Sequence, residues 1–383
     1  MKPRSHRRKH QGAEPEAMED KENAGSAAPP AKRPRRERKA LAELPTGSAT
    51  NSASAPPPSP QRASKPRTRS QVAREATAAE GEDARKRKGS ADVTRPVVSG
   101  QPDAGAAQGS VVPYIGDIDR YLRSLEVRQS RRPRDDYVGT IQKDINAKMR
   151  GILVNWLVEV AEEFRLQADT LYLAVTYVDR FLTAIAVPRN KLQLLGVASL
   201  FVAAKYEEIN PPKVNKFSDI TDSTYTNQQV VKMEADILKY LNFEVGSPTI
   251  RTFLWRFIAC CGGNCGSAKQ LEFMCSYLAE LSLLDYDCIK FLPSVVAAAC
   301  LFVARFTISP KTRPWNSTLQ RNTGYKVSDL KSCILRIHDL QLGREYQDLD
   351  AIRNKYSGRK FGCVSSMTPP EEISASFLRD FSR

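Results

Sequence analysis

Residues 191–205, KLQLLGVASLFVAAK, are apolar on nearly every side of a helix, with small Ala, Gly and Ser residues between the larger ones. A helix without a polar face belongs inside a bundle, because neighbours must cover all of its sides. The small residues allow those neighbours to approach closely. This stretch therefore predicts the central helix of a bundle. Strand patterns are scarce elsewhere, which favours an all-α fold.

The pattern of this helix returns 101 residues further along the chain. The stretch LLGVASLFVA at 194–203 corresponds to VVAAACLFVA at 295–304. An internal repeat indicates two copies of one structural unit, each a bundle of about five helices. The run Gly-Ser-Pro at 246–248 breaks the helical periodicity between the copies. We expect the first bundle, with a preceding helix, over residues 113–246 and the second over 247–350.

A second helical face precedes the central helix of the first bundle. Met149, Leu153, Trp156, Val160 and Phe164 follow one another at steps of three and four residues. That spacing places them on one side of a helix. Another helix is expected from Leu171 through Val178, ending before Pro188.

The first part of the chain has a different composition. The whole chain carries a formal net charge of +15, and basic residues are concentrated in a leader, residues 1–112, that has no Phe, Trp or Tyr. Such a segment cannot bury enough apolar surface to offset its chain entropy. We expect a disordered leader there, and a short tail over residues 351–383.

Several classes of site find no support in the sequence. Cys260, Cys261 and Cys265 lie in CCGGNC, but no second pair of ligands follows at a zinc-binding spacing. The N-terminus lacks the apolar stretch of a signal peptide, and no apolar run is long enough to span a membrane. The chain contains three His and no Gly-rich phosphate loop or nucleophile elbow. We expect an intracellular, soluble protein with reduced thiols and without a metal, a cofactor or catalytic residues.

Several blocks of the chain resemble the cyclin box. They are MRGILVNWLVEVAEEF at 149–164, LYLAVTYVDRFL at 171–182, KLQLLGVASLFVAAKYEE at 191–208 and DITDSTYTNQQVVKMEADILKYLNFEVGSPT at 219–249. They occur in the order and spacing of that family, and the resemblance covers roughly residues 113–350. The segments YEEINPP and EVAEEF are similar to the corresponding segments of A-type cyclins. The Ala-rich basic leader is similar to the leaders of plant members. B-type cyclins are near relatives and remain an alternative.

This resemblance implies a regulatory subunit that binds and activates a cyclin-dependent protein kinase and controls cell-cycle progression, including mitosis. Lys205 and Glu234 match an ion pair that contacts the kinase in the family. Taken without the resemblance, they would be read as a solvated surface pair. In the second bundle, Phe306 stands opposite Lys205, so that copy lacks this polar site and would act as a stabilising module. The implied kinase-binding residues are Ile118, Tyr121, Lys205, Tyr206, Glu207, Glu208, Glu234 and Phe243.

The resemblance also implies a groove for short Arg-x-Leu peptides of substrates and inhibitors. The alternative is that the same residues belong to the core, because a groove face and a buried face share one periodicity. The matching positions are Met149, Ile152, Leu153, Trp156, Glu159 and Gln193.

Arg150 and Asp179 match a buried ion pair that braces the first two helices of the box in the family. Two nearby residues depart from the family pattern. Gly151 stands where Ala is usual, and Asn155 where Asp is usual.

The leader contains short elements that resemble control signals of cyclins. Lys21, Glu22 and Asn23 match the KEN degron read by the anaphase-promoting ubiquitin ligase. Arg38 and Leu41 fit a destruction box, although Thr46 replaces its usual Asn. Two basic runs are similar to nuclear import signals and predict a nuclear protein that can shuttle to the cytoplasm; they comprise Lys32, Arg33, Arg35 and Arg36, and Arg85, Lys86, Arg87 and Lys88.

A different reading of the basic charge is a nucleic-acid contact. Basic tails attract phosphate without specificity, but no aromatic residue stands among these runs to stack on bases. A transcription-associated DNA-binding protein with two cyclin-like repeats is the competing class. Such proteins often carry a zinc ribbon ahead of the repeats, and this chain has no Cys before residue 260. We expect no membrane partner and no specific nucleic-acid partner.

Overall fold

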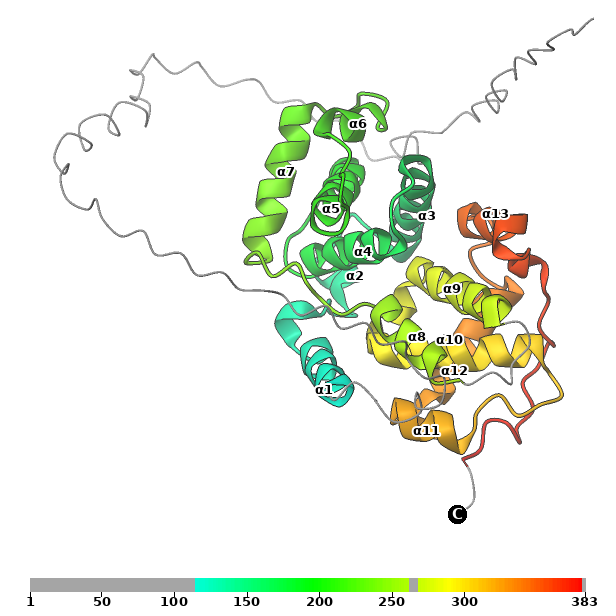
Figure 1. The fold of residues 1–383 in the computed structure, drawn as a ribbon. Helices are drawn as coiled ribbons and strands as arrows, with labels where there is room; N and C mark the ends of the chain where they lie inside the picture. The colour runs from blue at the N-terminus through cyan, green and yellow to red at the C-terminus, as the bar shows by residue number, and fades with distance from the viewer. Residues whose placement is uncertain (1–113, 262–267, 381–383) are drawn as a thin grey trace, which may run out of the picture. The chain divides into compact units, whose positions relative to one another are not determined.

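The structure, a computed structural model, describes residues 114–261 and 268–380. Its regular elements in these ranges are all helical, and one isolated bridge between Val138 and Gln142 is the β contact found there (Figure 1). The all-α prediction is confirmed. The expected leader, with its degrons and import signals, lies outside the described residues.

The first bundle surrounds one buried helix. Its helices are α3 (Ala147–Phe164), α4 (Ala168–Leu182), α5 (Leu192–Glu207), α6 (Val214–Asp219) and α7 (Asn227–Tyr240). The other four contact α5, whose residues from Leu192 to Ala204 are all buried (Figure 1). The stretch without a polar face is therefore the central helix, as its sequence predicts.

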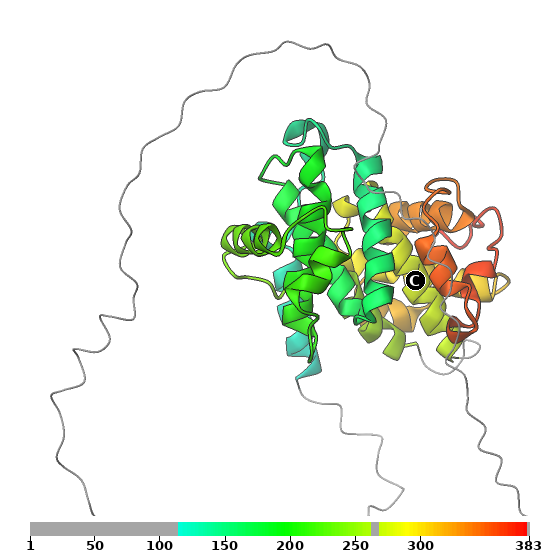
Figure 2. The same ribbon diagram turned by 90° about the horizontal axis from the view of Figure 1, so that it is seen from above.

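The second bundle repeats this order. It contains α8 (Ile250–Ala259), α9 (Ala268–Leu284), α10 (Pro293–Ile308), α11 (Ser317–Thr323) and α12 (Val327–Leu342). The central helix is α10, which contacts α8, α9 and α12. The bounds of α5 and α10 differ by 101 residues at both ends, so the sequence repeat is also a structural repeat. Both views show the two bundles side by side (Figures 1 and 2).

Local capping explains where several helices begin. The Asn146 side chain accepts a hydrogen bond from the backbone N–H of Met149 at the start of α3, with a donor–acceptor distance of 2.9 Å. Thr226 and Thr249 each form a reciprocal capping box, at the starts of α7 and α8. Such side chains bind backbone N–H groups that have no partner within the helix.

The packed region extends past residue 350, the expected end of the second bundle. It continues with α13 (Ala351–Tyr356), η5 (Arg359–Phe361) and η6 (Val364–Ser366). Ile352, Tyr356 and Val364 are buried, and α13 contacts α3 and α9. The Asn155 side chain accepts a hydrogen bond of 3.1 Å from the Ala351 N–H. The segment expected as a tail is thus part of the fold, and Asn155 binds its first helix.

The other departure from the family pattern lies where α3 meets the second bundle. A Cβ atom added at Gly151 would stand 3.3 Å from the Leu284 carbonyl oxygen and 3.3 Å from a Leu349 methyl carbon. Glycine therefore lets α3 approach α9 closely. Nearby, the rings of Tyr137 and Tyr286 meet edge to face at 5.0 Å.

Among the described residues, no helix has both the length and the apolar character needed to cross a membrane.

Candidate partner-binding site

Large apolar side chains are exposed at four of the positions implied for kinase binding. The exposed fractions are 45% for Ile118, 60% for Tyr121, 53% for Tyr206 and 69% for Phe243. The first two lie on α1 (Ile115–Glu126), Tyr206 ends α5, and Phe243 follows α7. Phe243 also has a φ of 58°, which is unusual for a bulky side chain. Exposed apolar groups gathered in this way are typical of a protein contact surface.

Lys205 and Glu234 lie within this surface and bind one another. The Lys205 ammonium, in the last turn of α5, donates a hydrogen bond to Glu234 Oε1 on α7, and it lies 4.3 Å from the centre of the Phe201 ring. The Glu234 side chain is largely buried, whereas 42% of the Lys205 side chain is exposed. The ammonium can therefore still reach acceptors on a partner.

The two carboxylates after Tyr206 have different roles. Glu208 Oε1 accepts hydrogen bonds of 2.6 Å from the Gln167 N–H and 2.6 Å from the Thr170 hydroxyl, so Glu208 caps the start of α4. This intramolecular role was not apparent from the sequence. Glu207 is exposed, and partial burial together with Asp169 and Glu208 raises its pKa.

A pocket joins α1 to the end of α5. Tyr121, Tyr206 and Glu207 line it, so residues that are 85 positions apart in sequence face one space. Gly246 also borders it, and a Cβ there would stand 2.7 Å from the Tyr206 hydroxyl. The Gly that breaks the helical pattern between the bundles thus makes room for a candidate contact residue.

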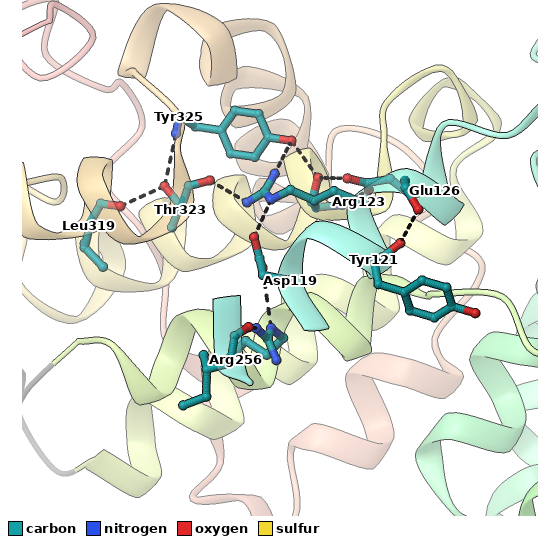
Figure 3. A network of polar contacts seen from close by, with 11 residues as sticks. Asp119, Tyr121, Arg123, Glu126, Arg256, Leu319, Thr323 and Tyr325 are labelled. Carbon is teal, nitrogen blue, oxygen red and sulfur yellow. Dashed lines mark hydrogen bonds and ion pairs between the residues drawn. The ribbon is translucent and has the colours of Figure 1, made fainter. Parts of the chain in front are cut away.

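The second bundle holds α1 in place, chiefly through Arg123 (Figure 3). Its guanidinium donates to the Thr323 carbonyl at 2.6 Å and to the Tyr325 hydroxyl at 3.3 Å. It also pairs with Asp119 at 2.8 Å, and Asp119 lies 3.5 Å from Arg256 of α8. Arg123 therefore connects α1 to the last residue of α11 and to the segment that follows it.

Glu126, in the last turn of α1, caps the central helix of the second bundle. Its carboxylate accepts hydrogen bonds from the Ser294 N–H at 3.0 Å and the Ser294 hydroxyl at 2.7 Å. Glu126 is buried, which raises its pKa, and the hydrogen bonds from Ser294 oppose this only in part. A carboxylate near the N-terminus of a helix also interacts favourably with the helix dipole. No pattern in the sequence indicates this contact.

The implied peptide groove occupies part of α3 and the start of α5. Met149, Trp156 and Gln193 keep only 8–9% of their surface exposed, while Ile152 and Glu159 are partly exposed. Leu153 has no exposed surface, and its methyl carbon lies 2.7 Å from the position of a Cβ at Gly196. Leu153 is therefore a core residue that supports this face from below, not a residue that lines an open groove.

Arg150 and Asp179 form the buried ion pair that the family resemblance implies. Their side chains make two hydrogen bonds, of 2.8 and 2.7 Å, and the Tyr137 hydroxyl donates a third to Asp179 at 2.8 Å. Burial alone would lower the pKa of Arg150, but Asp179 outweighs it and raises that pKa. Arg150 also donates to the Leu283 carbonyl of α9, so the pair connects the two bundles as well as α3 and α4.

The described part of the chain contains no cluster of side chains suited to bind a metal ion. No three His, Cys, Asp or Glu side chains gather there closely enough to hold a metal ion. Cys260, Cys288, Cys300, Cys333 and Cys363 are free thiols, and Cys265 lies outside the described residues.

Comparison with known proteins identifies the family. Residues 117–246 match the cyclin N-terminal domain, and residues 248–370 match the cyclin C-terminal domain. The chain belongs to the cyclin family. Both domain matches agree with the two bundles, and the second extends into the segment after residue 350.

Plant cyclins of the A type are among the similar proteins. Cyclin-A3-2 of Oryza sativa subsp. japonica is 59% identical over 70% of this chain and 70% of its own length. The putative cyclin-A3-1 of Arabidopsis thaliana is 54% identical over 70% of this chain and 75% of its own. The G2/mitotic-specific cyclin C13-1 of Daucus carota is 52% identical over 70% and 78%. The prediction of a plant A-type cyclin is confirmed.

The fold also has a solved relative. A viral cyclin from herpesvirus saimiri superimposes with a TM-score of 0.52 at 20% identity, covering 59% of this chain and 96% of that one. The two-bundle cyclin fold is therefore confirmed. As an A-type cyclin, the chain is a regulator of cyclin-dependent kinases in the cell cycle, and cyclins act as regulatory subunits rather than as enzymes.

Proposed function

We propose that this cyclin activates its kinase through the surface formed by Ile118, Tyr121, Lys205, Glu234 and Phe243. The observation that supports this most strongly is the pair of the half-exposed Lys205 and the largely buried Glu234 among exposed apolar side chains. The apolar groups supply area to bury, while the ammonium and the carboxylate can hold backbone carbonyl and N–H groups of the kinase.

Activation requires more than tight binding. A protein kinase works when the Glu of its mobile helix pairs with the Lys that holds the nucleotide phosphates. A regulator favours that state only by binding it more tightly than the inactive state. A rigid face fits this task, because α5 and α7 are fixed in the bundle core and α1 is fixed by Arg123 and Glu126.

A second surface on α3 is proposed to select substrates and inhibitors with Arg-x-Leu motifs. Ile152 and Glu159 are its partly exposed residues, and Met149 and Trp156 lie beside them with a small exposed fraction. The apolar side chains suit the Leu of such a motif, and the Glu159 carboxylate suits its Arg. Leu153 supports the surface without taking part in it.

The leader is proposed to control abundance and location. Its KEN sequence and destruction box would recruit the anaphase-promoting ubiquitin ligase, and its two basic runs would direct nuclear import. Truncation of residues 1–112 should lengthen the half-life of the protein through mitosis and reduce its nuclear fraction. An unchanged half-life and distribution would contradict both roles.

The kinase proposal is tested with the purified full-length protein. It is incubated with plant cyclin-dependent kinases, and binding is measured by pull-down and activity by histone phosphorylation. We expect at least one kinase to bind and to gain activity. Failure to bind or activate any of them would contradict the proposal.

A further inference from the structure

A surface pocket with several cations is lined by none of the residues proposed for kinase binding or peptide binding. It is bordered by the segment after α1, the ends of α4 and α7, and η4 (Tyr286–Lys290). Its cationic lining residues are Arg132, Arg134, Arg180 and Lys290; we call this site the basic pocket. Asp135 is its one lining carboxylate among the described residues.

Arg180 carries a buried charge without an ion pair among the described residues, although the Glu244 carboxylate acts on it from a longer distance. The side chain is buried, with 4% exposed. Its guanidinium donates to the Ser130 carbonyl at 2.7 Å, the Glu244 carbonyl at 3.1 Å and the Ser247 hydroxyl at 3.3 Å. All three acceptors are neutral, and no described carboxylate lies within 4.0 Å. A buried charge without a counter-charge is unfavourable, and a bound anion would relieve that cost.

Arg132 and Lys290 add two further cations without an ion pair among the described residues. Arg132 donates through Nη2 to the Lys290 carbonyl at 2.6 Å, and its Nε is buried without a hydrogen-bond partner among the described residues. The Lys290 ammonium is exposed and lies 5.2 Å from the centre of the Phe291 ring. An unsatisfied buried donor favours an added acceptor.

The other carboxylates near the pocket already interact with neighbouring side chains. Asp136 binds Arg134 through two hydrogen bonds, of 2.9 and 2.6 Å. Glu244 lies 3.5 Å from Arg131, and Glu126, which accepts hydrogen bonds from Ser294, also acts electrostatically on Arg132. Among the described lining residues of the basic pocket itself, Arg132, Arg134, Arg180 and Lys290 outnumber the single carboxylate of Asp135. This excess of positive charge suits a ligand with two negative charges better than a carboxylate.

We propose that the basic pocket binds the phosphate group of a phosphorylated Ser or Thr in a protein partner. A phosphomonoester supplies close to two negative charges and three acceptor oxygens, which match guanidinium and ammonium donors. A nucleic acid would need a longer basic track with several stacking rings, whereas Tyr240 is the only aromatic side chain among the described lining residues. The choice of a phosphoprotein rests on the proposed function, because the activated kinase produces such groups.

The test measures binding by the full-length protein alone, so its result does not depend on kinase activation. The probe is a labelled peptide of residues 54–65 of this chain with phosphoserine at Ser59, because Ser59-Pro60-Gln61-Arg62 fits the Ser-Pro-x-basic pattern of cyclin-dependent kinase substrates. Its binding is followed by fluorescence polarisation. The same peptide without phosphate should bind at least about tenfold more weakly, since charge-assisted hydrogen bonds are lost. Equal binding of the two peptides would overturn the proposal.

Variants assign the binding to this pocket. Lys290→Ser removes an exposed cation and should weaken phosphopeptide binding about tenfold. Lys311→Ser, a matched change of an exposed lysine outside the pocket, should leave it unaltered. An unaltered affinity in Lys290→Ser would overturn the assignment. Kinase activation on an unphosphorylated peptide should be the same for Lys290→Ser and the wild type, which separates this site from the kinase-binding surface.

Competitors separate the sources of phosphate. Inorganic phosphate should displace the phosphopeptide only at concentrations well above the Kd of the peptide. If inorganic phosphate binds as tightly as the phosphopeptide, the ligand is free phosphate and the phosphoprotein proposal fails. If single-stranded DNA binds more tightly and Lys290→Ser abolishes that binding, the pocket is a nucleic-acid site and the proposal fails as well.

Discussion

The carboxylate of Glu126 accepts both the backbone N–H and the hydroxyl of Ser294, and so the helix before the first bundle caps the central helix of the second. The two residues are 168 positions apart. Through this contact the second bundle determines where Ile118 and Tyr121 lie, because both belong to α1. The second bundle is therefore more than a stabilising module: it positions part of the proposed kinase-binding surface.

Replacing Glu126 with Ala should weaken both stability and kinase binding. The Ser294 N–H would be left as a buried donor without its acceptor, while the hydroxyl can still bind Tyr325, at a cost of about 1–3 kcal/mol in the free energy of unfolding. Loosened α1 contacts should lower kinase affinity although Lys205 is intact. Urea unfolding and kinase pull-down measure the two effects. Asp117→Ala, an exposed change on the same helix, is the control and should alter neither; equal behaviour of the two variants would argue against the anchoring role.

The pH dependence of unfolding should reveal the same carboxylate. Burial raises the pKa of Glu126 above its ordinary value of 4.5, so the folded state holds the proton more tightly than the unfolded state. The stability from this group is fully present below pH 4.5 and is lost as pH rises through the folded-state pKa. As pH rises through the folded-state pKa, the wild type should therefore lose more stability than Glu126→Gln. Parallel stability curves for the two proteins would contradict this expectation.

The buried ion pair between Arg150 and Asp179 should be sensitive to loss of one partner. Asp179→Ala leaves the Arg150 charge buried without its counter-charge, which should cost about 3–5 kcal/mol in unfolding free energy. The midpoint of urea denaturation measures it. Asp136→Ala breaks the exposed pair with Arg134 and should leave the midpoint nearly unchanged. A similar midpoint shift in both variants would show that burial does not decide the effect.

Two helical glycines should respond in opposite directions to Ala. At Gly196 a Cβ would stand 2.7 Å from a Leu153 methyl carbon, so Gly196→Ala should destabilise the first bundle by about 1–3 kcal/mol. At Gly116 a Cβ meets no atom within 4 Å, so Gly116→Ala should stabilise α1 by about 0.5–1 kcal/mol. Thermal unfolding compares them. A stabilising Gly196→Ala would mean that α3 and α5 are less closely packed than the structure indicates.

The sequence predicted the parts of the fold that depend on local pattern. The apolar stretch at 191–205 predicted a central helix, and the repeat predicted its counterpart, α10, because buried helices require apolar residues on all sides. It could not distinguish a core residue from a groove residue at Leu153, since both share one helical periodicity. The complete burial of Leu153 and its close approach to Gly196 decide that question.

Contacts between distant segments were beyond the reach of the sequence. Neither the cap of α10 by Glu126 nor the cap of α4 by Glu208 follows a local spacing rule. Asn155 likewise seemed only a departure from the family pattern until the structure placed it at the start of α13. Each of these polar groups finds a backbone partner far away in the chain, which residue type and periodicity alone do not reveal.

The central claim, that Lys205 and Glu234 contact the kinase directly, is tested most directly by exchanging their charges. Lys205→Glu and Glu234→Lys are made singly and together, and histone phosphorylation by a bound cyclin-dependent kinase is measured, with Lys311→Glu as the control for an exposed lysine. Each single variant should lose activation, and the double variant should also remain inactive, because it restores the internal pair but presents the wrong charges to the kinase. Recovery of full activation in the double variant would show that the pair serves only the fold, and would contradict the claim.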